Sequence, residues 1–334
     1  MAFLEVLLAL TVERLWLSVT TWRRFTWFTR FVAWSEARAA PAHATYPGGD
    51  GTEEITTPPP SANKNGQARV LLLTLAPAVG VGLLHHLLTE SLLILTFIFD
   101  VAVLVYCLGP KDLDTQVRSF IHAYTHLGKE EAGPHLAGIV NIDIAQAPLS
   151  TPQMLQALIE AILIEANERW FAVIFWFVVL GPLGAVFYRL SSLLLLHHHV
   201  NGPRPDNLET AASDVPDSFA EATQRLHAIL GWVPARITAL SYAVMGSFVD
   251  AIDGWNQGLP RLVTGQPPIS HSSSNADVVR NSGLGALRMH DILQGTGKKP
   301  LSISHVRNAL ALVWRTLIFC MALMLAATLI NWLV

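Results

Sequence analysis

The chain has 334 residues, of which 51% are hydrophobic and 14% are charged, and its formal net charge is −3. Because an average soluble domain carries roughly 25% charged residues, this composition argues against an ordinary soluble domain. The slightly acidic balance gives no reason to expect nucleic acid as a partner. The two cysteines, Cys107 and Cys320, lie in apolar surroundings and provide neither a disulfide framework nor a metal-ligand spacing.

Residues 1–38 are predicted to form an apolar helix with a basic flank. Residues 3–19 are apolar on most faces but contain Glu13-Arg14, and a charge in the middle of a span costs about 3 kcal/mol on insertion scales. Residues 39–68 include a glycine-rich turn sequence and three consecutive prolines. This composition predicts a disordered linker that leads into a membrane-embedded domain over 69–334.

Four segments of that domain pass or nearly pass the test for a membrane-spanning helix, which needs about 20 mostly apolar residues. They are 70–88, 91–108, 170–196 and 309–334. The first two are separated only by Thr89-Glu90, which predicts a helical hairpin in the membrane. We therefore expect an all-α fold, a polytopic membrane helical bundle with amphipathic or interfacial helices and polar cytoplasmic loops.

Two segments leave the topology open. Segment 170–196 has Gly181-Pro182 in its middle, which predicts a kink or break. Segment 229–252 is apolar but contains Arg236, so an interfacial position is favoured over a full span. The positive-inside rule predicts that the three polar regions rich in basic residues all lie in the cytoplasm. That is possible if 170–196 re-enters at the break or if 229–252 crosses. Of these two arrangements, re-entry is favoured.

One charge lies deep within a predicted span. Asp100 is near the centre of 91–108, and an ionisable residue at bilayer depth is a functional candidate. Arg14 and Arg315, from other apolar segments, are candidate partners. Either a structural ion pair between helices or a proton relay fits this pattern, and a relay would indicate a proton-coupled carrier.

The richest polar constellation surrounds the third apolar segment. Glu165 and Asn167 precede it, and Tyr188-Arg189 follows its glycines. The carboxylate of Glu165 suits a cytosolic metal ligand or the base of a phosphate site. A solvated helix end followed by an interfacial anchor fits the same spacing.

Three further residues are candidates for binding a small cytoplasmic ligand. Arg236 could bind a phosphate or carboxylate through two hydrogen bonds, or its side chain could extend to the lipid headgroups; the sequence favours neither. His271 and Asn275 belong to a polar segment that opens into a helix of small residues, which fits a ligand site or a flexible loop. The consecutive histidines 197–199 would point in different directions on a helix, so no metal site is predicted.

In this order, the segments resemble the AmpE family of membrane proteins. The most specific match is the run from Glu165-Ala-Asn167-Glu-Arg-Trp to Tyr188-Arg189. The next is Gly-Trp-Val-Pro-Ala-Arg, which ends at Arg236, and further matches are Glu13-Arg14-Leu15, 106–113 and 274–277. The resemblance covers nearly the whole chain except 39–68. It implies a bacterial inner-membrane protein linked to cell-wall stress and β-lactamase induction.

The AmpE family is similar in turn to the CobD/CbiB family of cobalamin biosynthesis. Those inner-membrane enzymes join an aminopropanol arm to the corrin ring, with ATP-driven activation of a carboxyl. The positions that match their pattern are Glu165, Asn167, Gly181, Gly184, Tyr188, Arg189, Pro234, Arg236, His271, Ser273, Asn275 and Ala276. After Tyr-Arg, however, the synthases carry Asn-Thr-Leu-Asp-Ser-Met, where this chain has Ser191-Ser192 and then leucines.

The leading hypothesis is therefore a regulatory membrane modulator of the AmpE type that is not an enzyme and needs no cofactor. The alternative is an ATP-dependent enzyme similar to adenosylcobinamide-phosphate synthase, which would use ATP and Mg²⁺. The third hypothesis is the proton-coupled carrier indicated by Asp100.

Overall fold

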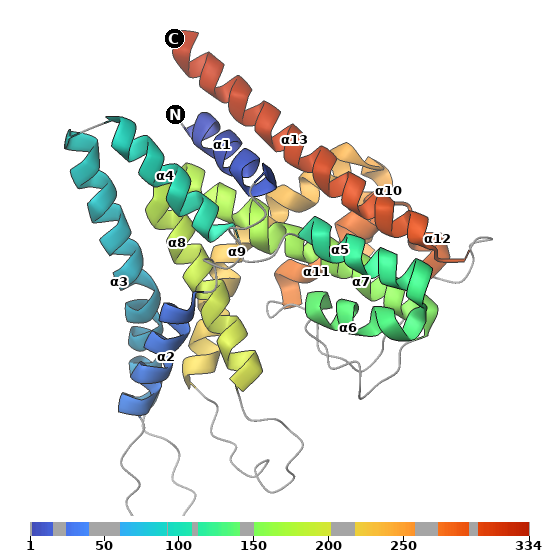
Figure 1. Ribbon diagram of the computed structural model, residues 1–334, viewed down its shortest axis with the longest axis horizontal. Coiled ribbons are helices and arrows are strands. Elements are labelled where there is room, and N and C mark those ends of the chain that lie inside the picture. The colour runs from blue at the N-terminus through green and yellow to red at the C-terminus, as the bar shows by residue number, and fades with distance from the viewer. Residues whose placement is uncertain are drawn as a thin grey trace, which may run out of the picture.

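The computed structural model describes residues 2–15, 25–39, 61–91, 93–108, 113–140, 150–201, 218–257, 273–293 and 300–333. Within these ranges the regular structure is helical and contains no strand (Figure 1), which confirms the all-α prediction. The α-helices are α1 (Ala2–Leu15), α2 (Thr26–Ala39), α3 (Ser61–Ser91), α4 (Leu93–Cys107), α5 (Leu113–His122), α6 (Lys129–Val140), α7 (Thr151–Ala166), α8 (Ala172–Asn201), α9 (Ser218–Met245), α10 (Phe248–Gln257), α11 (Ser273–Ala286), α12 (His290–Leu293) and α13 (Ile303–Leu333). Two π-helical segments, η2 (Ala123–Leu127) and η3 (Asn167–Phe171), interrupt this series.

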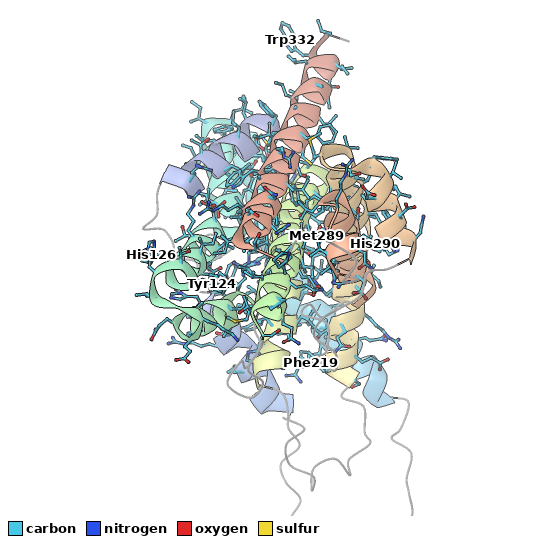
Figure 2. The ribbon with its side chains drawn as sticks, turned by 90° about the vertical axis from the view of Figure 1, so that its right-hand side faces the viewer. Tyr124, His126, Phe219, Met289, His290 and Trp332 are labelled. Carbon is cyan, nitrogen blue, oxygen red and sulfur yellow. The ribbon has the colours of Figure 1, made fainter. Side chains whose placement is uncertain are left out.

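Four stretches of the described chain are long and apolar enough to cross a membrane. They are Gly66–Glu90, Thr151–His197, Ser218–Met245 and Ile303–Leu333, and α4 is a shorter apolar helix. Large apolar side chains on these helices face outward, including Leu72, Ile94 and Trp332, which are 63%, 78% and 81% exposed. Trp332 lies at the tip of α13, far from the start of α9 (Figure 2). An apolar surface of this extent is suited to lipid, as expected for a polytopic membrane protein.

Helix α8 reverses direction at the predicted break. Gly181 has φ 66° and ψ −155°, a backbone conformation that is essentially restricted to glycine. Beyond the turn, Tyr188 Oη donates a hydrogen bond to Glu168 Oε2 at 2.6 Å, although Glu168 lies 20 residues earlier. A straight helix would separate such residues by about 30 Å, so the chain folds back on itself. A Cβ atom on Gly184 would collide with the carbonyl oxygen of Trp176, which shows how closely the two arms approach.

The part of the incoming arm between η3 and the reversal, residues 172–180, rises about 14 Å. α7 and η3 precede it without a break, so the helical stretch is continuous from Thr151 to His197. Re-entry of this hairpin into the membrane stays a prediction. The apolar segment 170–196 is not one straight span.

Segment 229–252 is not a single helix, and its interfacial position stays a prediction. The structure divides it between α9 and α10 at a turn around Gly246, and α9 begins earlier, at Ser218. The longer helix is among those long and apolar enough to cross a membrane. Arg236 is accommodated because its guanidinium lies 4.0 Å from the centre of the Trp232 ring.

The predicted linker is only partly described. α2 ends at Ala39 and α3 begins at Ser61, so residues 61–68 are helical. Residues 40–60 lie outside the described part of the chain.

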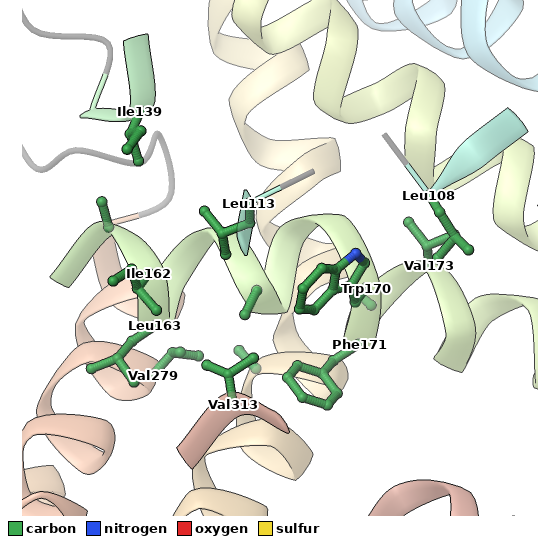
Figure 3. Packing of buried hydrophobic residues seen from close by; sticks show 14 of the residues in the cluster. Leu108, Leu113, Ile139, Ile162, Leu163, Trp170, Phe171, Val173, Val279 and Val313 are labelled. Carbon is green, nitrogen blue, oxygen red and sulfur yellow. The ribbon is translucent and has the colours of Figure 1, made fainter. Parts of the chain in front are cut away.

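α7 forms the centre of the core. Ile162 and Leu163 pack among Ile139 of α6, Val279 of α11 and Val313 of α13 (Figure 3). One ion pair crosses this core, between Arg280 Nη2 of α11 and Glu160 Oε1 of α7 at 2.8 Å. Gln156 donates a second hydrogen bond to the same oxygen at 2.7 Å. The buried charges of α7 and α11 are thus paired, as burial requires, and the core fixes α7 as the support for η3.

Candidate functional site

The π segment η3 groups polar side chains at the base of the α8 hairpin. π-Helical turns displace side chains from the regular α-helical register and are frequent at functional sites. Glu165, in the last turn of α7, accepts a hydrogen bond from Arg169 Nε at 2.6 Å. Arg169 Nη1 also donates to Gln116 Oε1 of α5 at 3.0 Å. These contacts fix the Glu165 carboxylate between α5 and the hairpin, and both side chains of the ion pair are about 15% exposed.

Glu168 is the meeting point of three helices. Its Oε2 atom accepts the hydrogen bond from Tyr188 and lies 3.1 Å from His227 Nε2 of α9. The Tyr188 and His227 rings lie 5.4 Å apart. Ser191 Oγ is 3.3 Å from the other nitrogen of His227, Nδ1, and the same hydroxyl donates to the Tyr188 carbonyl at 2.7 Å.

This arrangement places an imidazole between a carboxylate and a hydroxyl. A histidine oriented by a carboxylate is the usual means of moving a proton at a reacting centre. Ser191 is fully buried and holds His227 from behind, so it is placed to orient the ring rather than to attack a substrate. Glu168 and His227 are therefore the candidate proton-transfer pair.

Arg189 follows Tyr188 on α8 and supplies a buried positive charge. The residue is 6% exposed, and its Nε atom has no hydrogen-bond partner among the described residues. The guanidinium lies 5.9 Å from the centre of the Phe25 ring, just before α2. A buried donor without an acceptor is costly, and a planar guanidinium matches the oxygens of a phosphate or carboxylate. Arg189 is therefore the candidate anion-binding group of the site.

Asn167 precedes Glu168 on η3 and contacts α9, whereas Arg236 takes part in a different group of polar side chains. Thr238 Oγ1 of α9 donates to Asn167 Oδ1 at 2.9 Å. Arg236, two positions earlier on α9 and so on a different face, donates to Asn275 Oδ1 at 3.1 Å. Asn275 in turn donates to the Ala228 carbonyl at 2.7 Å. Arg236 and Asn275 thus form a second polar group, between α9 and α11.

We call the first group the Glu168 cluster; its members are Glu165, Asn167, Glu168, Tyr188, Arg189, Ser191 and His227. His271, a further sequence candidate, lies outside the described residues.

The intramembrane charges are placed differently from the predicted pairings. Asp100 Oδ1 lies 2.7 Å from His85 Nδ1, across the α3–α4 hairpin. Arg14 instead lies over the Trp314 ring at 4.7 Å, and Arg315 Nε donates to the Ala311 carbonyl at 3.2 Å. His85 and Asp100 are nearly equidistant along the chain from the turn between the helices. That spacing was the signal that could have identified the pair.

Sequence reasoning also missed the role of His227. It is a single histidine on an apolar helix, a type of residue that is most often structural. The available signal was a buried stripe that includes Thr223, His227 and Thr238, spaced at whole turns along one face of α9. Among the described residues, no group of three His, Cys, Asp or Glu side chains is placed to hold a metal ion.

Comparison with known proteins identifies the family. The model of the CobD/Cbib protein family matches residues 6–194, more than half of the chain. A curated relative from Chromobacterium violaceum is 29% identical over 280 residues, which cover 84% of this chain and 78% of the relative. Another, from Stutzerimonas stutzeri strain A1501, is 28% identical over 228 residues, 64% of this chain and 68% of the relative. Both are named cobalamin biosynthesis protein CobD, and no solved structure matches.

These matches contradict the leading hypothesis from the sequence. The AmpE assignment is not supported. Relatives named for cobalamin biosynthesis contradict both a role in β-lactamase regulation and the expectation that the protein is not an enzyme. The enzymatic function was rejected because the segment after Tyr188-Arg189 lacks the polar residues of the synthases, and that segment was considered alone. In the structure, Glu168 and His227 bring a carboxylate and an imidazole to that place from other helices. The chain belongs to the CobD/CbiB family.

Proposed function

We propose that the protein is an amide-forming enzyme of cobalamin biosynthesis, of the adenosylcobinamide-phosphate synthase type, in the bacterial inner membrane. It would join the amino group of an aminopropanol phosphate to a carboxyl group of a corrinoid, with consumption of ATP, at the cytoplasmic face. The observation that carries this proposal is the contact of Glu168 with Tyr188 and His227, with the buried Arg189 following Tyr188 in the chain, in a member of this family. These groups supply a proton acceptor next to a binding site for an anion.

The chemistry requires the carboxylate to gain a leaving group before the amine can displace it. Transfer of the terminal phosphoryl group of ATP to a carboxylate oxygen gives an acyl phosphate and ADP. The amine nitrogen then attacks the carbonyl carbon, the C–O bond to phosphate breaks, and the nitrogen loses a proton. Glu168 is the group placed to take up that proton, because both ring nitrogens of His227 already contact Glu168 or the buried Ser191. Arg189 would bind the departing phosphate.

Mg²⁺ would enter this reaction together with ATP. It is usually held by one or two protein carboxylates, with phosphate oxygens and water completing the shell. The absence of a three-ligand cluster among the described residues is compatible with that mode of binding. Glu165, which is partly exposed and held by Arg169, is the carboxylate of the cluster that fits this role.

The test is an assay on detergent-purified protein with cobyrate, aminopropanol phosphate and ATP. The readouts are ADP release and the mass of the corrinoid product. We expect corrinoid-dependent ADP release, reduced at least about 100-fold in Glu168→Gln because a proton-transfer group is lost. Glu221→Gln is the matched control, since Glu221 is an exposed carboxylate on α9 that pairs with Arg225. Folded wild-type protein that releases no ADP in response to the corrinoid and the amine would refute the proposal.

A further inference from the structure

A groove separate from the Glu168 cluster runs along α13. It consists of two adjoining cavities of about 770 and 700 Å³, between α1, α5 and α13. In Figure 1, α1 lies along the half of α13 that leads to the C-terminus, and α5 lies along the other half. No member of the Glu168 cluster lines either cavity, and η3 contributes only Trp170. The groove is therefore a site that the proposed reaction does not use.

The lining is basic at one end. Arg307, in the first turns of α13, lines the larger cavity, and Arg14, near the end of α1, and Arg118 of α5 line both. Arg118 is held by an ion pair with Asp114, 2.7 Å from carboxylate oxygen to Nε. The other ionisable residues of the lining are Glu13, His122 and His126. Arginines outnumber carboxylates, so this end favours an anion.

The lining is apolar at the other end. The wall formed by α13 continues from Trp314 through Ile318 to Met321, residues that follow the helical repeat along one face. α1 runs antiparallel to α13 here, and its apolar Leu7 lies at the end of the groove away from Arg14. Polarity therefore changes in the same direction on both helices.

The dimensions agree with a molecule that has a charged head and an apolar tail. The α13 wall from Arg307 to Met321 is about 21 Å long, of which the part beyond Trp314 is about 10 Å. One leaflet of the hydrocarbon core is about 15 Å thick. Arg14 lies against the Trp314 ring, 4.7 Å from its centre. A tryptophan with an arginine is typical of the boundary between headgroups and hydrocarbon.

We propose that this groove binds one anionic phospholipid from the bilayer, with its phosphate at Arg14, Arg118 and Arg307 and an acyl chain along Ile318 and Met321. The arginines favour an acidic over a zwitterionic headgroup, because the positive group of a zwitterionic headgroup would be repelled by them. The apolar wall favours a lipid over a water-soluble phosphate, because only a lipid covers it.

Native mass spectrometry of delipidated protein in detergent tests this proposal. The probes are phosphatidylglycerol, phosphatidylcholine and glycerol 3-phosphate, added separately. We expect phosphatidylglycerol to bind about tenfold more tightly than phosphatidylcholine, a ratio in line with one charge-assisted hydrogen bond. Equal binding of the two lipids, or binding of glycerol 3-phosphate as tight as that of phosphatidylglycerol, would overturn the proposal.

Variants locate the lipid. Arg118→Gln should remove most of the preference for phosphatidylglycerol. Arg225→Gln should preserve it, because Arg225 is also an exposed arginine in an i,i+4 ion pair but lies on α9. Ile318→Trp, at a side chain that is 66% exposed, should obstruct the groove without changing charge and reduce the binding of both lipids. Thermal unfolding identifies variants that have not folded, and lipid binding unchanged in both folded groove variants would place the lipid elsewhere.

Discussion

The protein contains two helical hairpins that use buried charge in different ways. In the α3–α4 hairpin, Asp100 contacts His85 of the other arm, and the buried carboxylate of Glu5 on α1 lies near both. In the α8 hairpin, the polar groups lie at the base and reach residues of other elements. Tyr188 of α8 meets Glu168 of η3, which also contacts His227 of α9. The first contact joins the two arms of one hairpin, whereas the second gathers groups around a reversal of the chain, next to an arginine whose Nε has no partner among the described residues.

The two turns differ in the same sense. The α3–α4 hairpin has long arms joined near Glu90, which is exposed and polar, as expected for a turn at an aqueous surface. The α8 turn is glycine and proline, and the adjacent Val179 and Leu180 are apolar and about half exposed. The first turn is polar and exposed, whereas the second is apolar and brings Tyr188 back to η3.

The largest effect is expected from His227→Gln, which breaks the proposed proton-transfer pair. Corrinoid-dependent ADP release should fall at least about 100-fold, because glutamine cannot exchange a proton with Glu168. Thermal unfolding should change much less, since the amide can still donate to Glu168. His85→Gln in the other hairpin is the control and should retain activity within about threefold. Equal losses of activity in the two variants would remove the functional distinction between the hairpins.

The second effect concerns the turns of the backbone. Gly181→Ala forces a side chain into a conformation that costs about 1–3 kcal/mol, and it should lower both thermal stability and activity because the turn positions Tyr188. Gly80→Ala in α3 is the matched control. A Cβ at Gly80 meets nothing within 4 Å, and alanine is the better helix former, so stability should be unchanged or higher. Destabilisation by Gly80→Ala alone would contradict the geometry of both hairpins.

The sequence predicted the elements better than the site. Hydropathy located α3, α4 and α13, and Gly181-Pro182 located the reversal of α8, because length, apolarity and glycine act locally. His85 could have been identified as the partner of Asp100 from its spacing to the turn, but the sequence analysis looked for an arginine instead. The partner of Tyr188 could not be predicted from the sequence, because hydropathy and helical periodicity identify the buried face of a helix but not the residue opposite. The family was misjudged for the same reason. The segment after Arg189 contains few polar residues. In the structure, however, polar side chains from η3 and α9 lie next to it.

Asp100→Asn sharpens the comparison from the structural side. It removes the charge but leaves an oxygen that can face His85, so we expect a loss of about 1 kcal/mol in the free energy of unfolding. Activity in the corrinoid assay should remain within about threefold of wild type. A loss of activity without a loss of stability would give the α3–α4 pair a functional role, such as proton transfer, and would end its description as a structural contact.

The smallest effect is expected at the surface turn of the same hairpin. His86 Nε2 and Glu90 Oε1 are 3.7 Å apart, and both side chains are about 70% exposed. Solvent screens such a pair, so Glu90→Gln should change the free energy of unfolding by less than about 0.5 kcal/mol. Comparison with Asp100→Asn under identical detergent conditions separates burial from charge, because both changes replace a carboxylate by an amide beside a histidine. If the two variants were equally destabilised, burial of Asp100 between the arms would contribute nothing, and the Asp100–His85 contact would be equivalent to a surface ion pair.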